Sequence, residues 1–291
     1  MANVSARDRL QGVGGLAIFW QAWLPAGDPR AVVVIAHGAG EHSGRYEHVA
    51  ARLRREGWAV YALDHRGHGR SEGPRALIDR MRHTVADLQT LVGLTRARHR
   101  DAPCFLLGHS MGGTVALRYA ITHGQDLRGL ILSGPLAAIE DAPAALRALV
   151  PVLSALAPRM PLLAVDPQLV SRDPAVVEAY RSDPLVHHGK LPARTVAELA
   201  TAVASLPDSV GAITTPTLIA YGTADGLCPP AGSLMVKERI GAADATLRAY
   251  EGLAHEILNE PEQAEVMDEI CAWITERLGP TDQGMVASQG T

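Results

Sequence analysis

Short, continuous apolar runs alternate along most of this chain with segments whose apolar residues recur at helical spacing. Each run is short enough for a strand that helices cover on both faces. The predicted strands are 31–36, 59–63, 104–107, 130–132, 217–221 and 246–250, and the main predicted helices are 46–55, 84–98, 230–240 and 261–278. Residues 12–24 alternate loosely and predict an opening hairpin or a pair of edge strands. The alternation of strands and helices predicts an α/β fold with a parallel, doubly wound sheet.

The pattern changes between residues 134 and 207. Nine prolines interrupt short helical pieces there, and no convincing strand is present. Because proline breaks helices and sheet ladders, we predict a mainly helical cap at 135–206 that is inserted into the fold. The core then comprises 1–134 and 207–279, and the polar residues 280–291 are predicted to form a flexible tail.

The stretch 142–165 within the predicted cap carries more large apolar side chains than a small cap needs to cover the core. One interpretation is an apolar tunnel entrance that makes transient contact with a membrane or micelle surface and extracts a single-chain lipid. The alternatives are that these side chains pack the cap onto the sheet, or that they form the contact of a homodimer. They are Leu146, Leu149, Val150, Val152, Leu153, Leu156, Leu162 and Leu163.

Length, charge and cysteine content limit the classes of protein to which this sequence can belong. The 291 residues, 47% hydrophobic and 20% charged, suffice for one large α/β domain with an insertion or for two small domains. A net charge of −4 gives no electrostatic case for nucleic acid as a partner. Three cysteines without a C-x-x-C pair argue against a disulfide scaffold and fit a reducing compartment. Since the first ten residues lack the apolar core of a signal peptide, we expect a cytoplasmic protein whose membrane contact, if the cap provides one, is peripheral.

A nucleophile elbow is predicted where the strand 104–107 meets the following helix. The sequence Gly108-His-Ser-Met-Gly112 is a G-x-S-x-G motif between a strand and a helix, which is the context that such an elbow requires. Ser110 then lies at the tip of a tight turn, in a strained backbone conformation that directs its hydroxyl out of the sheet. The N–H groups at the start of the helix point toward the same spot, where an oxyanion would form.

The base for this serine is chosen among the histidines that follow it, since the chain order in this fold is Ser, acid, His. Four histidines follow Ser110. His123 lies at the far end of the elbow helix, about 18 Å from its start, and His187 and His188 fall in the predicted cap. His255 lies in a loop just past the last strand, and we take it as the base; a loop histidine that caps the last helix is the alternative.

The acid that orients the base is expected to leave the carboxyl end of a core strand. Asp225 does so, because it follows the strand 217–221. Asp208 and Asp244 precede strands and therefore lie at the opposite edge of the sheet. The predicted orienting acid is Asp225.

Two backbone N–H donors are expected to stabilise the oxyanion. One belongs to Met111, the residue after the nucleophile. The other belongs to Ala39, in the glycine-rich loop that follows the strand 31–36. A mere turn is the alternative for that loop, but its pairing with the elbow favours the donor role.

Two further patterns give only weak signals for a cofactor site or a metal site. The segment Gly67–Gly73 follows a strand, but its spacing is one residue too long for a dinucleotide loop and Pro74 stands where a helix should open. Four histidines near the first two core strands have no metal-ligand spacing and are expected to hydrogen-bond within loops; they are His37, His42, His65 and His68. We therefore expect no cofactor and no metal.

Five blocks of this sequence together resemble the monoacylglycerol lipases of the α/β-hydrolase superfamily. The blocks are His37–Tyr46, Asp64–Ser71, Gly108–Gly113, Ser182–Leu185 and Gly222–Cys228, and the likeness extends over about residues 12–278. The elbow is shared by many hydrolases, whereas the first block is far more specific. The resemblance implies an α/β-hydrolase fold, with a mostly parallel eight-stranded sheet flanked by helices and an inserted cap.

The resemblance also implies an activity and a set of roles. The activity is hydrolysis of a monoacylglycerol, a small lipid ester, to a fatty acid and glycerol. The implied catalytic triad is Ser110, Asp225 and His255, with Ala39 and Met111 as oxyanion donors. It further suggests that Glu41, Arg45 and Tyr180 lie near the glycerol hydroxyls, and that Leu185 and Leu227 lie near the acyl tunnel.

The sequence departs from the family pattern at two positions. Gly226 replaces the arginine that often follows the catalytic acid, and Leu258 stands where some members carry a second, glycerol-binding histidine. A carboxylesterase or lysophospholipase with the same triad is therefore the alternative enzyme. A non-catalytic, ligand-binding hydrolase relative is the alternative from another class, and hydrolases with an aspartate nucleophile are excluded by the serine at the elbow.

Overall fold

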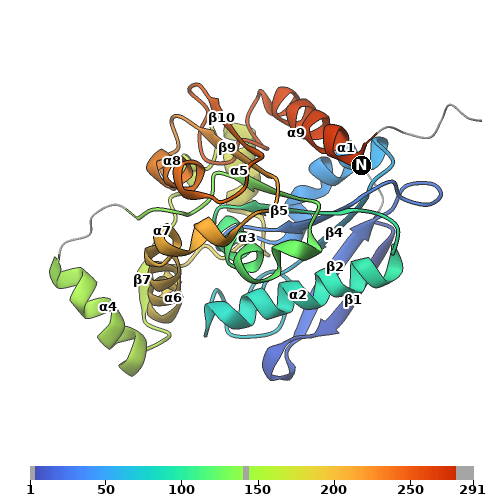
Figure 1. The fold of residues 1–291 in the computed structure, drawn as a ribbon. Coiled ribbons are helices and arrows are strands. Elements are labelled where there is room, and N and C mark those ends of the chain that lie inside the picture. Colours follow the sequence, from blue (N-terminus) through green and yellow to red (C-terminus); the bar gives the residue numbers. More distant parts are fainter. Residues whose placement is uncertain (1–3, 140–143, 280–291) are drawn as a thin grey trace, which may run out of the picture.

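The computed structural model describes residues 4–139 and 144–279, which form a twisted sheet with helices on both sides (Figure 1). The strands follow the spatial order β1-β2-β4-β3-β5-β6-β9-β10. Strand β2 is antiparallel to both of its neighbours, and the strands from β4 to β10 are parallel. Their bounds are β1 Ala6–Gln11, β2 Ala17–Trp23, β3 Val32–Ala36, β4 Ala59–Leu63, β5 Cys104–His109, β6 Gly129–Ser133, β9 Thr217–Gly222 and β10 Ala245–Tyr250. The predicted mostly parallel, eight-stranded sheet is confirmed.

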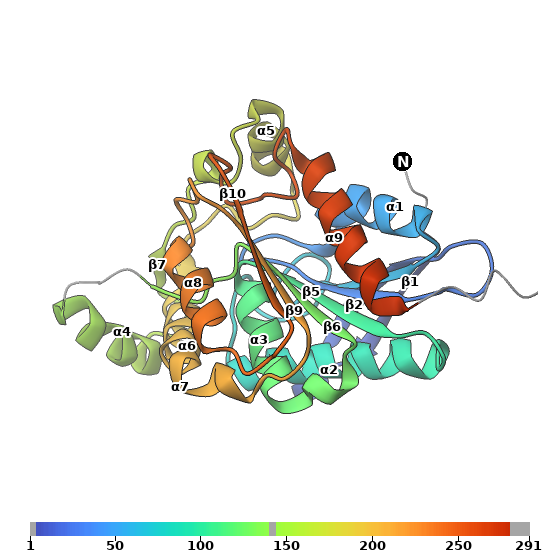
Figure 2. The ribbon, with the colours of Figure 1, turned by 45° about the horizontal axis from the view of Figure 1, so that its top comes forward.

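Helices cover both faces of the sheet, so its central strands are buried on either side (Figure 2). Side chains of α1 and α9 pack on one face, and those of α2, α3 and α8 pack on the other. Within β3, Val32 and Val34 belong to one apolar cluster whereas Val33 and Ile35 belong to the other, as the period of two in a strand requires. The helices are α1 Glu47–Arg55, α2 Met81–Arg98, α3 Met111–His123, α8 Pro230–Arg239 and α9 Gln263–Leu278.

The chain between β6 and β9 leaves the sheet and forms several further elements, of which α6 packs against the core. We call residues 135–206 the cap, of which 140–143 lie outside the described residues. Its elements are α4 Ala144–Leu156, β7 Pro161–Leu163, α5 Pro174–Ser182, β8 Leu191–Pro192 and α6 Ala193–Ala204, and α7 Leu206–Ser209 leads from it back toward the sheet. Short 3₁₀ helices also occur along the chain, at η1 Val13–Gly15, η2 Ser43–Tyr46, η3 Gly124–Asp126, η4 Pro167–Leu169 and η5 Val210–Ala212. The domain bounds stay a prediction, and the predicted tail at 280–291 lies outside the described residues.

The expectation that the cap contains no strand is wrong. Strands β7 and β8 pair antiparallel and form a small separate sheet. Each contains a proline, Pro161 and Pro192, and each has three residues or fewer. Proline cannot donate to a ladder and is tolerated in such short edge strands, so a pattern that treats proline as a strand breaker misses them.

Helix α4 extends away from the sheet at one end of the molecule (Figures 1 and 2). Several of its large apolar side chains are exposed, including Leu149, Val152 and Leu156. No helix within 4–139 or 144–279 is both long enough and apolar enough to cross a bilayer. The exposed apolar face of α4 therefore lies on a helix of 13 residues that does not meet the requirements of a membrane span.

Candidate active site

Ser110 lies in the tight turn between β5 and α3, in a conformation that few residues adopt. Its φ of 54° and ψ of −122° lie outside the regions favoured by L-amino acids. The flanking glycines permit the turn, because a Cβ at Gly108 would lie 2.5 Å from the Gly112 carbonyl oxygen, and one at Gly112 would lie 2.0 Å from the Ala36 carbonyl oxygen. The predicted elbow is present, and strain is stored at the residue predicted to be the nucleophile.

Asp225 and His255 come from loops that follow neighbouring parallel strands, β9 and β10, and they meet in the interior. The Nδ1 atom of His255 lies 2.8 Å from Oδ2 of Asp225. The other carboxylate oxygen of Asp225 accepts the backbone N–H groups of Leu227 and Cys228 at 2.9 and 2.8 Å. A carboxylate that accepts from Nδ1–H leaves Nε2 of the same imidazole as a proton acceptor, which is the arrangement a general base needs.

Contacts connect this pair with the elbow. The rings of His109 and His255 lie 4.7 Å apart between centroids, and His109 directly precedes Ser110. The hydroxyl of Ser110 lies 3.8 Å from Sγ of Cys228, whose backbone N–H is bound by Asp225. Burial raises the pKa of the Cys228 thiol, so this neighbour stays neutral at ordinary pH. The structure thus brings the predicted nucleophile, acid and base to one edge of the sheet.

The loop after β3 runs beside the nucleophile. A Cβ at Gly38 would lie 3.1 Å from Cβ of Ser110. The N–H of Gly38 donates to Glu41 at 2.5 Å. In the part of the chain that the structure describes, the N–H groups of Ala39 and Met111 have no protein acceptor.

Glu41 is buried and holds this loop in place. Its Oε1 atom accepts the Gly38 N–H at 2.5 Å and the Tyr46 hydroxyl at 2.7 Å, and its Oε2 atom accepts from Nη1 of Arg45 at 2.6 Å. Burial by itself would raise the pKa of Glu41, but Arg45, followed by His109, lowers that pKa to about 2. Glu41 is therefore a buried carboxylate that stays ionised throughout the neutral range.

Arg45 connects Glu41 with a residue that the sequence reasoning missed, Glu256. The guanidinium donates through Nη1 and Nη2 to the two carboxylate oxygens of Glu256 at 2.6 and 2.8 Å. It also lies over the ring of Tyr180, 4.8 Å from the centroid. Burial opposes the charge of Arg45, but Glu256 and Glu41 raise its pKa well above its ordinary value. The only sequence signal for Glu256 is its position directly after His255.

The two leucines that the resemblance places near an acyl tunnel occupy different surroundings. Leu227 packs against a small apolar cluster in the cap that includes Val177, Tyr180 and Val186. Leu185 is half-buried, and its carbonyl accepts a hydrogen bond from Arg75 at 3.1 Å. Their roles toward the acyl chain stay predictions.

Three of the four histidines considered as metal ligands form a buried cluster. The rings of His65 and His68 lie 4.5 and 5.4 Å from the ring of His37. His37 approaches the Gly38 carbonyl through Nδ1 and accepts the His65 N–H at Nε2. Burial lowers the pKa of each ring, so all three are neutral. Across 4–139 and 144–279, no group of three or more His, Cys, Asp or Glu side chains is arranged to hold a metal ion.

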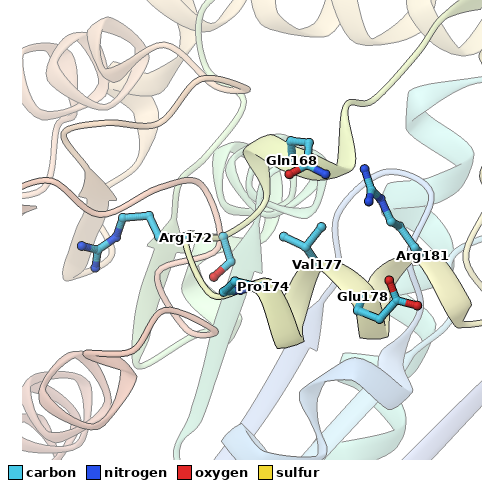
Figure 3. Close-up of a pocket in the computed structure, with 7 residues that line it drawn as sticks. Gln168, Arg172, Pro174, Val177, Glu178 and Arg181 are labelled. Atoms are coloured by element: carbon cyan, nitrogen blue, oxygen red, sulfur yellow. The ribbon is translucent and has the colours of Figure 1, made fainter.

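A surface cavity of about 380 Å³ lies beside α5 (Figure 3). Figure 3 shows the Arg172 side chain extending away from the other labelled side chains, and this arginine pairs with Glu260 and Glu262. The cavity is lined by Gln168, Ser171, Arg172, Pro174, Val177, Glu178 and Arg181. None of these is a predicted site residue, but Val177 also belongs to the apolar cluster that includes Tyr180.

Comparison with known proteins gives concordant results. A family model described as serine aminopeptidase, S33 (Hydrolase_4), matches residues 27–262. The chain is 45% identical to a monoacylglycerol lipase from Mycolicibacterium smegmatis, over 96% of this chain and 100% of that protein. It is 35% identical to a monoglyceride lipase from Rattus norvegicus, over 95% of this chain and 93% of that protein. A solved monoacylglycerol lipase from Paleococcus ferrophilus superposes with a TM-score of 0.81 at 31% identity, covering 89% of this chain and 99% of the other.

Proposed function

This chain belongs to the monoacylglycerol lipase family of the α/β-hydrolase superfamily, and on that premise we propose that it is a serine hydrolase that cleaves monoacylglycerols to a fatty acid and glycerol. The family and the fold class that the sequence indicated are both confirmed by these likenesses. The observation that carries the proposed chemistry is the 2.8 Å contact between His255 and Asp225, beside a strained serine at the elbow.

The mechanism follows from the roles of these three side chains. The hydroxyl oxygen of Ser110 attacks the ester carbonyl carbon while Nε2 of His255 accepts the hydroxyl proton, and Asp225 stabilises the imidazolium. The bond from the carbonyl carbon to the glycerol oxygen then breaks, and His255 gives its proton to that oxygen. Water attacks the acyl-enzyme, His255 takes a proton from it, and the fatty acid departs as the proton returns to Ser110.

The N–H groups of Ala39 and Met111 are proposed to donate to the tetrahedral oxyanion. Their freedom from protein acceptors supports this role. Each such donor contributes about 10²–10³ in rate in related chemistry.

Glu41, Arg45 and Tyr180 are proposed to lie on the glycerol side of the site, and Leu185 and Leu227 on the acyl side. The stacking of Arg45 over Tyr180 supports the first assignment, and the packing of Leu227 in an apolar cluster with Val177 and Val186 supports its place on the acyl side. Leu258 is 2% exposed and packs in the apolar cluster that includes α9, so it offers no polar group to an alcohol.

We propose that the cap makes transient contact with a membrane or micelle surface through α4. The exposed apolar side chains there support this, with Leu149 at 47%, Val152 at 49% and Leu156 at 82% exposure. A helix with such a face rests at the boundary between head groups and acyl chains. The cytoplasmic location and the homodimer stay predictions from the sequence.

The test of the proposed function is the Ser110→Ala variant. We expect turnover of 1-monooleoylglycerol to fall to the level of a matched blank while the circular dichroism spectrum stays unchanged. A fluorophosphonate probe should label the wild type and not the variant. Retained hydrolysis in the variant would refute the assignment of the nucleophile, and failure of the wild type to react with the probe would favour a non-catalytic relative.

A carboxylesterase or lysophospholipase is the second candidate, and the apolar burial of Leu258 is the observation that favours it. Initial rates on monoacylglycerols, diacylglycerols, lysophospholipids and p-nitrophenyl esters of matched acyl length separate the candidates. Preference for the monoacylglycerol at medium or long chain length supports the first candidate. Equal or greater rates on the other esters would overturn it.

A further inference from the structure

Glu256 lies where three segments of the site meet. It directly follows His255, and its backbone N–H donates to the carbonyl of Val170 in the cap at 2.8 Å. Its side chain is 5% exposed, and both carboxylate oxygens accept from Arg45. Nδ2 of Asn259 donates to the same carboxylate at 2.9 Å. The residue is therefore held on all sides by hydrogen bonds and has little freedom to move.

Arg45 connects Glu256 by hydrogen bonds to the loop beside the nucleophile. Its Nη1 atom donates to Glu256 and to Glu41, at 2.6 Å in each case. Glu41 accepts the N–H of Gly38 at 2.5 Å, and Gly38 directly precedes Ala39. A continuous series of peptide bonds and hydrogen bonds thus runs from the proposed base to the proposed oxyanion donor.

The three charged side chains in this series of hydrogen bonds, Glu41, Arg45 and Glu256, orient the segments that they join more than they stabilise the fold. Glu41 and Glu256 are buried carboxylates that share the one guanidinium of Arg45. Burying charged groups carries a desolvation cost that their attraction rarely exceeds, so the intact group adds little stability over an apolar replacement, although removal of one partner alone destabilises the fold. A guanidinium that binds a carboxylate through two parallel bonds fixes the direction of both groups. What the arrangement provides is a defined geometry between the segments it joins.

We propose that Glu256 is a positioning residue for ester hydrolysis: through Arg45 and Glu41 it fixes the Ala39 donor relative to the His255 base. The inference deepens the proposed function and rests on its assignment of base and oxyanion donor. Because displacements of about 1 Å cost up to about 10²-fold in rate, a change at Glu256 lowers kcat by shifting the groups that it holds in place. Because Arg45 acts in the same series, the effects of Glu256 and Arg45 are not additive.

The test is a double-mutant cycle of Glu256→Gln, Arg45→Gln and the two combined. The readouts are kcat and KM on p-nitrophenyl butyrate, the same constants on 1-monooleoylglycerol, and the rate at which a fluorophosphonate labels Ser110. The expected values are those for p-nitrophenyl butyrate. We expect each single variant to lose about 10- to 100-fold in kcat and in labelling rate, with KM changed less than about threefold. The double variant should be no worse than the poorer single variant.

A matched control removes a carboxylate from an exposed arginine pair. Asp268 binds Arg52 through Nε at 3.3 Å and Nη2 at 2.9 Å, and its side chain is 68% exposed. Asp268→Asn should leave kcat and labelling within about twofold of the wild type. If Glu256→Gln does not fold, Glu256→Asp keeps the charge and retracts it by one methylene, and it should still lower the labelling rate about tenfold.

Three results would overturn the positioning role. They are additive losses in the cycle, a rise in KM for monoacylglycerols with kcat unchanged, and a lower unfolding temperature with kcat and labelling unchanged. The second would make Arg45 a contact for the glycerol head, and the third would make Glu256 merely structural. If the wild type is labelled and cleaves p-nitrophenyl butyrate but not monoacylglycerols, the proposed substrate is refuted. The double-mutant cycle on p-nitrophenyl butyrate then still tests the positioning role of Glu256.

Discussion

Strand β3 of the sheet buries its apolar side chains, whereas helix α4 of the cap exposes several of its own. Strand β3 is buried along its whole length, with its side chains shared between the two apolar clusters of the core. Helix α4 in the cap instead exposes large apolar side chains to solvent. The sheet end holds the strained Ser110 and the His255–Asp225 pair, whose function depends on fixed geometry. The difference supports the proposed division of roles, in which the sheet fixes the reacting groups and the cap contacts the lipid.

The largest effect is expected from Asp225→Asn, which changes the sheet side of this comparison and leaves the cap intact. The amide cannot hold the His255 tautomer that accepts the serine proton, so kcat should fall about 10⁴-fold. The fall should be the same for p-nitrophenyl butyrate and for 1-monooleoylglycerol in vesicles, and steady-state rates on both measure it. A loss confined to the lipid substrate would contradict the division between sheet and cap.

Glu41→Gln is expected to have the next largest effect, on stability. The pKa of Glu41 lies at about 2 in the folded protein against an ordinary value of 4.5. Because the folded pKa is the lower one, the ionised carboxylate stabilises the fold by about 3 kcal/mol above pH 4.5, and that contribution disappears as the pH falls toward 2. Urea unfolding should give a difference between wild type and variant of about 3 kcal/mol at pH 6 that shrinks toward zero in acid.

The cap offers a matched comparison in Asp183. His42 lowers the pKa of Asp183 against the opposing effect of partial burial, and the side chain is 25% exposed. The sign is the same as for Glu41, but solvent screens the interaction. Asp183→Asn should change the free energy of unfolding by less than about 1 kcal/mol. If Glu41→Gln and Asp183→Asn changed the free energy of unfolding equally, the loop after β3 would be held no more rigidly than the cap.

The smallest effect on the catalytic groups themselves is expected from the combined change of Leu149, Val152 and Leu156 to serine, which alters only the exposed face of α4. Removing these exposed side chains should lower binding to phosphatidylcholine vesicles, and hydrolysis of monooleoylglycerol within them, by about tenfold, which corresponds to about 0.5 kcal/mol of apolar burial from each of the three side chains. The kcat for p-nitrophenyl butyrate should stay within about twofold. The control is Leu234→Ser, an equally exposed leucine on α8, which should change neither readout.

The sequence predicted the parts of this molecule whose signal is local. The run Val32–Ala36 and the motif around Ser110 are contiguous, so apolar pattern and turn chemistry reveal them directly. The contact between Asp225 and His255 spans 30 residues, yet it was predictable because both follow strands of one parallel sheet.

The features that the sequence did not reveal depend on partners far away in the chain. Glu256 acquires its role from Arg45, 211 residues away, and no local pattern marks that pairing. Strands β7 and β8 were missed because their prolines and their shortness resemble a loop. Each is stabilised by the other strand, and no periodicity in either segment predicts the pairing.

Leu136 has a consequence for exchanging caps between enzymes of this class. Its N–H donates to the carbonyl of Ser110 at 3.0 Å, and its own carbonyl accepts the Thr114 hydroxyl at 2.6 Å. The first residues beyond β6 therefore brace the turn that carries the nucleophile, although the chain has already left the sheet. A chimera joined at residue 134 would replace that brace, whereas one joined after Leu136 would retain it and exchange the remainder of the cap.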